Sequence, residues 1–380
     1  QVPRSVVAAM TDYLFNHNAN THWAYPSSAE TDEIIADSRQ SLADFLNASA
    51  DEIVFGQNMT SLTLHLARAL GRNFFSAGDE IIVTELDHHA NVDTWRALEV
   101  ERGVRIRVAP LNVECGTLEL SALENLLNEK TRLVAVGAAS NILGSITDVK
   151  SVCRLAREAG ALSFVDAVHY AAHNPVDVKS FDCDFLACSA YKFYGPHIGI
   201  LYGRKELLEQ TDFPKLRPAP DYAPERVETG TQSHESIAGA AAAVDFLASL
   251  SGSGNTRREK LENAFRELHL RQKELTRLLW HELSEIRNVK VYGPHCEEPR
   301  TSTISFVIRG VSSRQVAQKL SADYGIFASS GDFYALTVVE KLGLSGDVSG
   351  GLVRAGCACY TTVEEVERLI DGVRRIAEIG

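Results

Sequence analysis

The stretch "CDFLACSAYKFYGPHIGILYG", residues 183–203, joins two apolar runs through a polar insert. The runs 183–190 and 198–203 are short and rich in apolar residues, which is typical of buried strands. The insert carries one lysine, Lys192, next to Tyr191 and a Tyr-Gly-Pro turn. Because the stretch 189–203 holds too many glycines and polar groups to be plain core, packing does not explain Lys192.

Comparable apolar runs, rich in Val, Ile and Phe, precede this stretch at 79–86, 104–111, 131–140 and 161–168. Segments with helical spacing lie between most of them, as at 147–159, where Val149, Val152 and Ala156 recur on one side. This alternation predicts an α/β fold with a mostly parallel, doubly wound sheet.

The pattern changes toward the C-terminus. Four prolines within 212–226 predict a loop or domain edge, and the apolar stretch 236–250 is typical of a buried helix. From about 288 a smaller α+β unit is predicted, with strands at 302–310, near 325–329 and at 351–357, and helices at 312–322 and from 362. The last helix opens with a capping box, Thr362 to Glu365. We therefore expect a large domain over 20–255 and a small domain made of 1–19 and 256–380.

Composition narrows the function classes. The chain has 380 residues, 45% of them hydrophobic, and a formal net charge of −12, which argues against a nucleic-acid surface. No stretch reads as a membrane span, and the first residues lack the pattern of a secretory signal. The seven cysteines are scattered, without zinc-type CxxC pairs. We expect reduced thiols, no metal site and a cytoplasmic location.

Two polar residues follow neighbouring apolar runs. In an open parallel sheet, ligands bind beyond the carboxyl ends of the strands, so Asp166 and Lys192 are candidate site residues. A carboxylate and a lysine there suit pyridoxal phosphate: the carboxylate keeps the pyridine nitrogen protonated and the lysine forms a Schiff base. The alternative is a structural Asp-Lys ion pair at the rim of the sheet.

Other residues favour the cofactor. His169 could donate to the phenolic oxygen of the ring, and a histidine of the pair 88–89 could stack on it. Thr60 precedes an apolar helix within 55–70, where backbone amides and a hydroxyl could hold a phosphate. Each signal also has a structural interpretation, because core histidines are common and every helix needs a cap.

Seven stretches occur in an order and at spacings that resemble one family. They are "TSLTLHL" (60–66), "ELDHHANVDTW" (85–95), "SNILGSITDV" (140–149), "VDAVHYAAH" (165–173), "SAYKFYGPHIGILYG" (189–203), "RVETGTQSHESIAG" (226–239) and "VRAGCACYTTVEEVERLIDGV" (353–373). Together they resemble the class V aminotransferase superfamily, in its cysteine desulfurase and selenocysteine lyase branch. The resemblance covers nearly the whole chain and implies the fold of a fold-type I transferase that depends on pyridoxal phosphate.

The resemblance also implies roles at the ring. Lys192 would form the Schiff base, Asp166 would pair with the pyridine nitrogen, and His169 would lie near the phenolic oxygen. His88 would stack on the ring and serve in catalysis with Lys192 and Asp166. Asn141 would lie between the ring oxygen and the substrate.

Further roles concern the phosphate and the substrate. Met59, Thr60 and Ser189 would surround the phosphate, and Thr231 would reach the phosphate of a neighbouring subunit. A homodimer with shared sites is therefore implied. Arg354 would bind the carboxylate of a small amino-acid substrate, for which a bidentate guanidinium is well suited.

The chain departs from the family in three places. Tyr191 stands where better-known members have histidine, and Gln1 falls just after the position of the family's short leading segment. Most importantly, desulfurases use a mobile cysteine, but the corresponding stretch 325–344 has none and Tyr334 takes its place. Cys357 and Cys359 would point to the same side of a strand, as substitute nucleophiles or as small buried residues.

Three functions stay open on these grounds. The first is a desulfurase-like enzyme that cleaves a C–S bond or transfers sulfur from a cysteine-type substrate. The second is a pyridoxal-phosphate-dependent epimerase, lyase or aminotransferase acting on another amino acid. The third is a non-catalytic binding or regulatory relative, against which the joint presence of Lys192, Asp166, His88, Asn141 and Arg354 argues.

Overall fold

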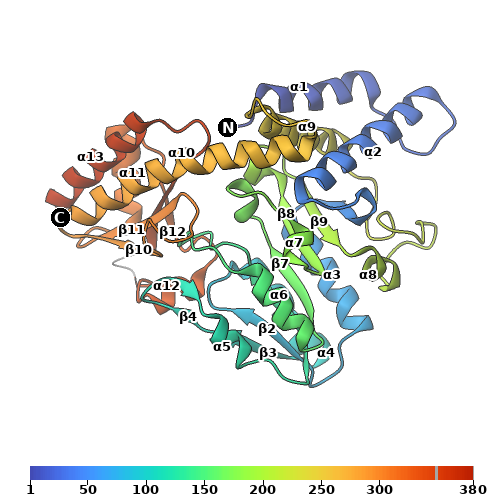
Figure 1. Ribbon diagram of the computed structural model, residues 1–380, viewed down its shortest axis with the longest axis horizontal. Coiled ribbons are helices and arrows are strands. Elements are labelled where there is room, and N and C mark those ends of the chain that lie inside the picture. Colours follow the sequence, from blue (N-terminus) through green and yellow to red (C-terminus); the bar gives the residue numbers. More distant parts are fainter. Residues whose placement is uncertain (347–349, 380) are drawn as a thin grey trace.

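The computed structural model describes residues 1–346 and 350–379, and Figure 1 shows a large and a small sheet joined by the long helix α10. The large sheet has seven strands, in the order β1 (Ile53–Gly56), β9 (Gly199–Gly203), β8 (Phe185–Ser189), β7 (Leu162–Asp166), β6 (Thr131–Gly137), β2 (Glu80–Thr84) and β3 (Arg105–Ala109). Pairs among β3, β2, β6, β7 and β8 are parallel, whereas β9 pairs antiparallel with β8 and β1. The predicted mostly parallel sheet is confirmed.

Helices cover both faces of this sheet. One apolar cluster joins it to α1 (Arg4–Asp12), α2 (Pro26–Leu46), α6 (Val149–Glu158), α7 (Val178–Phe181) and α9 (His234–Ser249). Another joins it to α3 (Met59–Asn73), α4 (Asp93–Arg102) and α8 (Lys205–Gln210), and α5 (Leu120–Glu124) lies near α6. The stretch 236–250 falls largely within α9, which is buried along most of its length, as predicted.

The start of α3 brings its amides to the carboxyl edge of the sheet. The side chain of Asn58 accepts from the amide of Ser61 at 2.9 Å and so caps the helix. The amide of Met59, the first residue of α3, donates to the hydroxyl of Ser189 at 3.0 Å, at the end of β8. The N-terminus of α3 is thereby tied to the strand that precedes Lys192.

The small sheet is antiparallel, in the order β10 (Val289–Tyr292), β11 (Thr303–Ile308), β13 (Leu352–Gly356) and β12 (Ser329–Gly331). It packs on α10 (Arg257–Glu285), α11 (Ser313–Tyr324) and α13 (Val363–Ile379), while α12 (Leu336–Lys341) and the hairpin β4 (Leu111–Asn112) with β5 (Thr117–Leu118) lie toward the large sheet. The capping box is present, because Thr362 and Glu365 exchange side-chain to backbone bonds of 3.0 and 3.3 Å.

Two sequence expectations need correction or comment. Cys357 and Cys359 do not lie on a strand, because β13 ends at Gly356. The domain division remains a prediction, because the first residues contact both predicted domains. Helix α1 packs against α9 of the large domain in the cluster that includes Val6. The amino group of Gln1 donates to the hydroxyl of Tyr360 in the small domain. Among the described residues, no helix is long and apolar enough to span a membrane.

Candidate active site

Asp166 and Lys192 lie at the carboxyl edge of the large sheet. Asp166 ends β7, and Lys192 follows the adjacent parallel strand β8 in a short 3₁₀ turn, Ala190–Phe193. One carboxylate oxygen of Asp166 accepts from the amide of Val168 at 2.9 Å, and no described ion pair joins Asp166 to Lys192. The Lys192 ammonium lies 5.0 Å from the ring centre of Tyr191. The structural ion pair considered from the sequence is therefore not formed.

Burial moves the pKa values of this pair in opposite directions. It raises the pKa of Asp166 to about 6, opposed by a backbone hydrogen bond and the charge of Lys192. It lowers the pKa of Lys192, and the positive charge of Arg354 lowers it further. Both shifts follow from loss of water around the charged forms. The edge of the sheet thus brings a buried carboxyl group, that of Asp166, near the exposed amine of Lys192.

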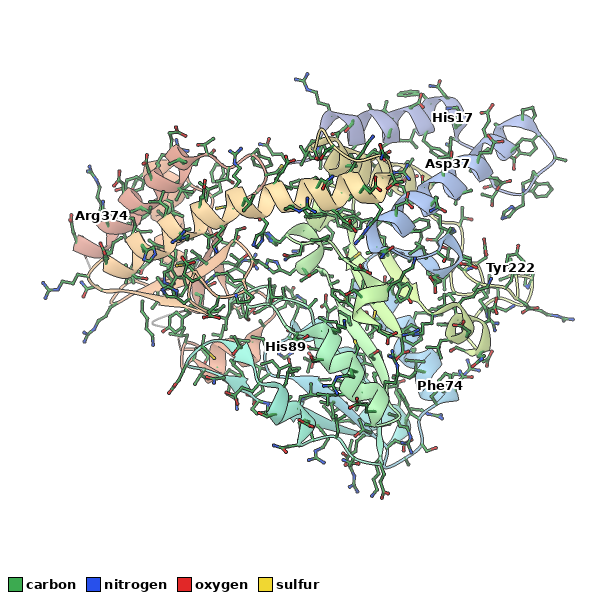
Figure 2. All side chains as sticks on the ribbon, viewed as in Figure 1. His17, Asp37, Phe74, His89, Tyr222 and Arg374 are labelled. Atoms are coloured by element: carbon green, nitrogen blue, oxygen red, sulfur yellow. The ribbon has the colours of Figure 1, made fainter. Side chains whose placement is uncertain are left out.

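The two adjacent histidines have different surroundings. Nδ1 of His88 accepts from the amide of Ala90 at 3.0 Å, so the proton of the neutral ring is on Nε2. Burial and the charge of Lys192 lower the pKa of His88 to about 4, which keeps the ring uncharged. His89, labelled in Figure 2, instead pairs with Asp93 at 2.8 Å. His88 is therefore the histidine available to stack on a cofactor.

His169 is held from the small sheet. Its Nε2 lies 3.2 and 3.1 Å from the hydroxyls of Thr301 and Thr303, which sequence reasoning missed. Burial, with the charges of His173, Arg354 and Lys192, lowers the pKa of His169 well below its usual value. The structure thus brings His169 into the electrostatic neighbourhood of Lys192 and Arg354.

Arg354 lies on β13 and is partly buried. Its side chain contacts Asn141. It donates to the carbonyl of Asn141 at 2.7 Å, and its guanidinium lies 4.1 Å from the ring centre of Phe333. Asn141 donates to the carbonyl of Phe333 at 2.9 Å, while its Oδ1 is buried without a hydrogen-bond partner. Arg354 forms no ion pair with a described carboxylate, so its charge is available for an acidic ligand.

Tyr334 contacts the two adjacent histidines, His88 and His89. Its ring stacks on that of His88 with centres 5.4 Å apart, and its carbonyl accepts from the amide of His89 at 2.7 Å. Phe333 and Tyr334 both have positive φ, 55° and 58°, which is rare for bulky residues. Hydrogen bonds to the carbonyls of Phe333 and Tyr334 hold these two residues in a left-handed backbone conformation that the sequence alone does not predict.

The residues expected around a phosphate are only partly brought together. Met59 and Ser189 are in contact through the hydrogen bond described above, and Thr60 follows at the exposed start of α3. Thr231 lies in the exposed loop before α9, and no described contact joins it to these residues. Tyr191 stacks on His197 with ring centres 5.0 Å apart.

Asp87 is a buried acid that sequence reasoning did not select. Its two oxygens accept from the amide of Gly137 at 2.9 Å and from the side chain of Asn91 at 2.8 Å. Burial, together with the negative charge of Asp166, raises the pKa of Asp87 to about 7. The signal was present, because Asp87 follows an apolar run just as Asp166 does.

The two C-terminal thiols have different surroundings. Cys357 is buried in the apolar cluster of the small sheet, and burial raises the pKa of its thiol to about 11. Cys359 is partly exposed, and its amide donates to the hydroxyl of Tyr194 at 3.0 Å. A protonated, buried thiol such as that of Cys357 is a poor nucleophile.

Comparison with known proteins adds to this geometry. The family model described as "Aminotransferase class-V" matches residues 1–369. The chain belongs to the class-V aminotransferase family. Within this family it is 33% identical over 391 residues to a cysteine desulfurase of Pectobacterium carotovorum, covering 99% of this chain and 90% of that protein. A Yersinia pestis cysteine desulfurase is also 33% identical, over 394 residues, covering 100% and 91%.

Solved structures of cysteine desulfurases have the same fold as this chain. The apo cysteine desulfurase of Thermococcus onnurineus superposes with a TM-score of 0.90 at 30% identity, covering all of this chain and 92% of that one. A cysteine desulfurase of Escherichia coli superposes with a TM-score of 0.85 at 26% identity, with the same coverage. The chain is thus a cysteine desulfurase-like enzyme with the fold of the fold-type I, pyridoxal-phosphate-dependent enzymes.

Proposed function

We propose that this enzyme binds pyridoxal phosphate at Lys192 and cleaves the bond between Cβ and sulfur in a cysteine-type amino acid. The observation that carries the proposal is the group of side chains at one edge of the sheet: the buried Asp166, the exposed Lys192 and the partly buried Arg354. Arg354 lacks a carboxylate partner, and Oδ1 of Asn141 lacks a donor. A cofactor and an amino-acid substrate would supply both.

The chain's residues would divide the work as follows. When bound, pyridoxal phosphate supplies an electron sink that makes the Cα proton acidic. Asp166 holds the ring protonated by its negative charge, and His88 packs its neutral imidazole on the ring. Arg354 binds and orients the substrate carboxylate. Lys192, whose pKa is lowered by burial, accepts the Cα proton once its amine is free.

The phosphate would be held at the start of α3. Backbone amides at a helix N-terminus suit an anion, and Thr60 adds a hydroxyl there, beside Met59 and Ser189. His169 lies near Lys192 and would donate to the phenolic oxygen of the ring. Thr231 would reach the phosphate of a partner subunit, so the functional unit would be a homodimer. A cytoplasmic location remains a prediction.

Sulfur would leave without forming a protein persulfide. The position of the family's mobile cysteine is Tyr334, whose hydroxyl cannot form a persulfide, and Cys357 is a buried, protonated thiol. The Cα–H bond breaks with its proton on Lys192, and the C–S bond then breaks with its electron pair on sulfur. Sulfide leaves, and hydrolysis of the remaining fragment gives pyruvate and ammonia. For cysteine the enzyme would therefore act as a lyase.

An amino-acid panel tests this proposal. We expect the purified or reconstituted protein to absorb visible light, and cysteine-type amino acids to change the absorption more than alanine or serine does. Lys192→Ala should lose the covalent absorption band. Asp166→Asn should still bind the cofactor but deprotonate Cα at least about a hundredfold more slowly, because a neutral pyridine is a poor electron sink. A colourless protein that takes up no added pyridoxal phosphate would refute the proposal.

A further inference from the structure

Two contacts hold Arg354 and leave one edge of its guanidinium free. Arg354 lies on β13, with Ser305 of β11 and Ser329 of β12 as its partners in the small sheet. Its Nη1 donates to the carbonyl of Asn141, and its Cζ lies over the ring of Phe333, 4.1 Å from the ring centre. Nε and Nη2 donate to no residue in the described part of the chain, and both are accessible to solvent. These two nitrogens form an edge that can bind a carboxylate bidentately.

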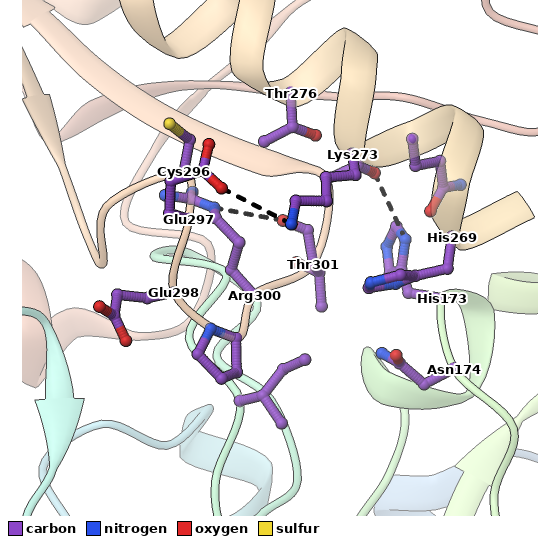
Figure 3. A pocket seen from close by; sticks show the side chains of 14 residues that line it. His173, Asn174, His269, Lys273, Thr276, Cys296, Glu297, Glu298, Arg300 and Thr301 are labelled. Carbon is purple, nitrogen blue, oxygen red and sulfur yellow. Dashed lines mark hydrogen bonds and ion pairs between the residues drawn. The ribbon is translucent and has the colours of Figure 1, made fainter. Parts of the chain in front are cut away.

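Arg300, a buried arginine just before β11, shows the opposite arrangement. It lies in the wall of a cavity between α10 and the segment 296–302 (Figure 3). Its Cζ also lies over an aromatic ring, 4.7 Å from the ring centre of Trp280. All three of its side-chain nitrogens, however, donate to backbone carbonyls. Arg300 therefore has a structural role, whereas Arg354 keeps an edge for a ligand.

The ring of Phe333 restrains Arg354 without using any of its donors. A guanidinium stacks on an aromatic face, whereas a carboxylate in the same place would form an ion pair and compete with a substrate. Phe333 is partly buried and packs against the apolar cluster that includes Ile142 and Leu352. That packing fixes the ring, and the ring in turn limits the orientations of the guanidinium plane.

The backbone of Phe333 is fixed independently of its ring. Its carbonyl accepts from Nδ2 of Asn141 at 2.9 Å, and the carbonyl of Asn141 accepts from Arg354 at 2.7 Å. Neither hydrogen bond involves the side chain of residue 333. A substitution of Phe333 by another apolar residue should therefore remove the contact between ring and guanidinium and leave both hydrogen bonds in place.

We propose that Phe333 is a positioning residue for amino-acid substrates. Its ring fixes the plane of Arg354 so that Nε and Nη2 donate together to the carboxylate, and this gives the enzyme its preference for substrates with a free carboxylate. The inference rests on the proposed function, in which Arg354 binds that group. Phe333 itself needs no contact with the substrate.

Isothermal titration calorimetry of the cofactor-loaded protein with L-alanine and L-alaninamide tests this inference. The two ligands differ only in that an amide replaces the carboxylate. Phe333→Leu should weaken the binding of L-alanine about tenfold and leave that of L-alaninamide unchanged, because the ring acts through the guanidinium. Phe333→Tyr retains the ring and should bind both ligands as the wild type does. Phe327→Leu is the matched control, because Phe327 is 88% exposed.

The outcomes separate this inference from the proposed function. Arg354→Gln should remove the preference for L-alanine, and adding Phe333→Leu to it should have no further effect. If Arg354→Gln removes the preference but Phe333→Leu does not reduce it, the inference is overturned and the proposed role of Arg354 stands. Equal weakening of both ligands by Phe333→Leu would show a merely structural ring and would also overturn it. If Arg354→Gln keeps the preference, both proposals fail. Phe333→Met decides the matter if Phe333→Leu does not fold.

Discussion

At the scale of single residues, the site includes two acids, Asp166 and Asp87, whose pKa values are raised by burial. Asp166 was predicted because an acid at the end of an apolar strand has no packing value. Asp87 was not, although the same argument applies, because its burial and its bond to Gly137 come from distant segments. The sequence identifies an acid near the end of a strand, but only the fold shows how deeply that acid is buried.

The stability of the cofactor-free protein should depend on Asp87. Its pKa is about 7 in the folded chain against 3.8 unfolded, so the folded state binds the extra proton between these values. The free energy of unfolding should therefore fall as pH rises from about 4 to about 7, by roughly 4 kcal/mol from this group. Chemical denaturation at several pH values should show a flatter profile for Asp87→Asn.

Asp182 provides the contrasting control for that experiment. Hydrogen bonds from Arg157 and Arg204 lower the pKa of Asp182, so its contribution is lost as pH falls rather than as pH rises. Asp182→Asn should thus change the profile in the opposite direction, at lower pH. Identical profiles for the wild type and Asp87→Asn would show that Asp87 is ionised in the folded protein throughout this range.

At the scale of elements, the strands and helices were largely predictable because their apolar spacing is regular. The exceptions are informative: β1 and β10 have four residues each, too short for a periodic signal. The stretch after β13 was wrongly predicted to continue as a strand through Cys357. The left-handed conformation at Phe333 and Tyr334 depends on contacts with Asn141 and His89, which local sequence does not contain.

The contact of β9 with α3 gives a test of the proposed phosphate site. Gly199 packs so closely on α3 that an added Cβ would lie 2.7 Å from Cα of Asn58. Gly199→Ala should push the start of α3 away from the sheet and misalign its amides. The affinity for pyridoxal phosphate should fall about tenfold or more, since bonds to a charged group contribute about 1.5–3 kcal/mol.

Gly252→Ala is the matched control, because no atom lies within 4 Å of the position of its added Cβ. Fluorescence titration of the cofactor-free proteins measures both affinities. Equal affinities for Gly199→Ala and the wild type would show that the phosphate is not held at the start of α3.

At the scale of the whole molecule, the proposed sites are shared between two chains. Thr231 lies in an exposed loop and has no described contact with Met59 or Ser189 of its own chain. We expect light scattering to give twice the mass of the chain, and Thr231→Ala to lower cofactor affinity several-fold. Thr229→Ala, in the same exposed loop, should not. A fully active monomer would contradict the shared site.

The family and the fold were predictable from the order of seven sequence stretches, because each carries groups fixed at a strand or helix end. The exact reaction was not, because it depends on which group meets the substrate's sulfur. The structure places Tyr334 against His88 and buries Cys357 with a raised pKa, which favours direct loss of sulfide.

Product analysis after incubation with L-cysteine tests this claim most directly. Sulfide, pyruvate, ammonia and alanine would be quantified, and the intact protein mass would reveal any persulfide. We predict sulfide with equal pyruvate and ammonia, no persulfide, and the same products from the Cys357→Ala, Cys359→Ala double variant. Alanine formed in step with a protein persulfide, and lost in the double variant, would contradict the account.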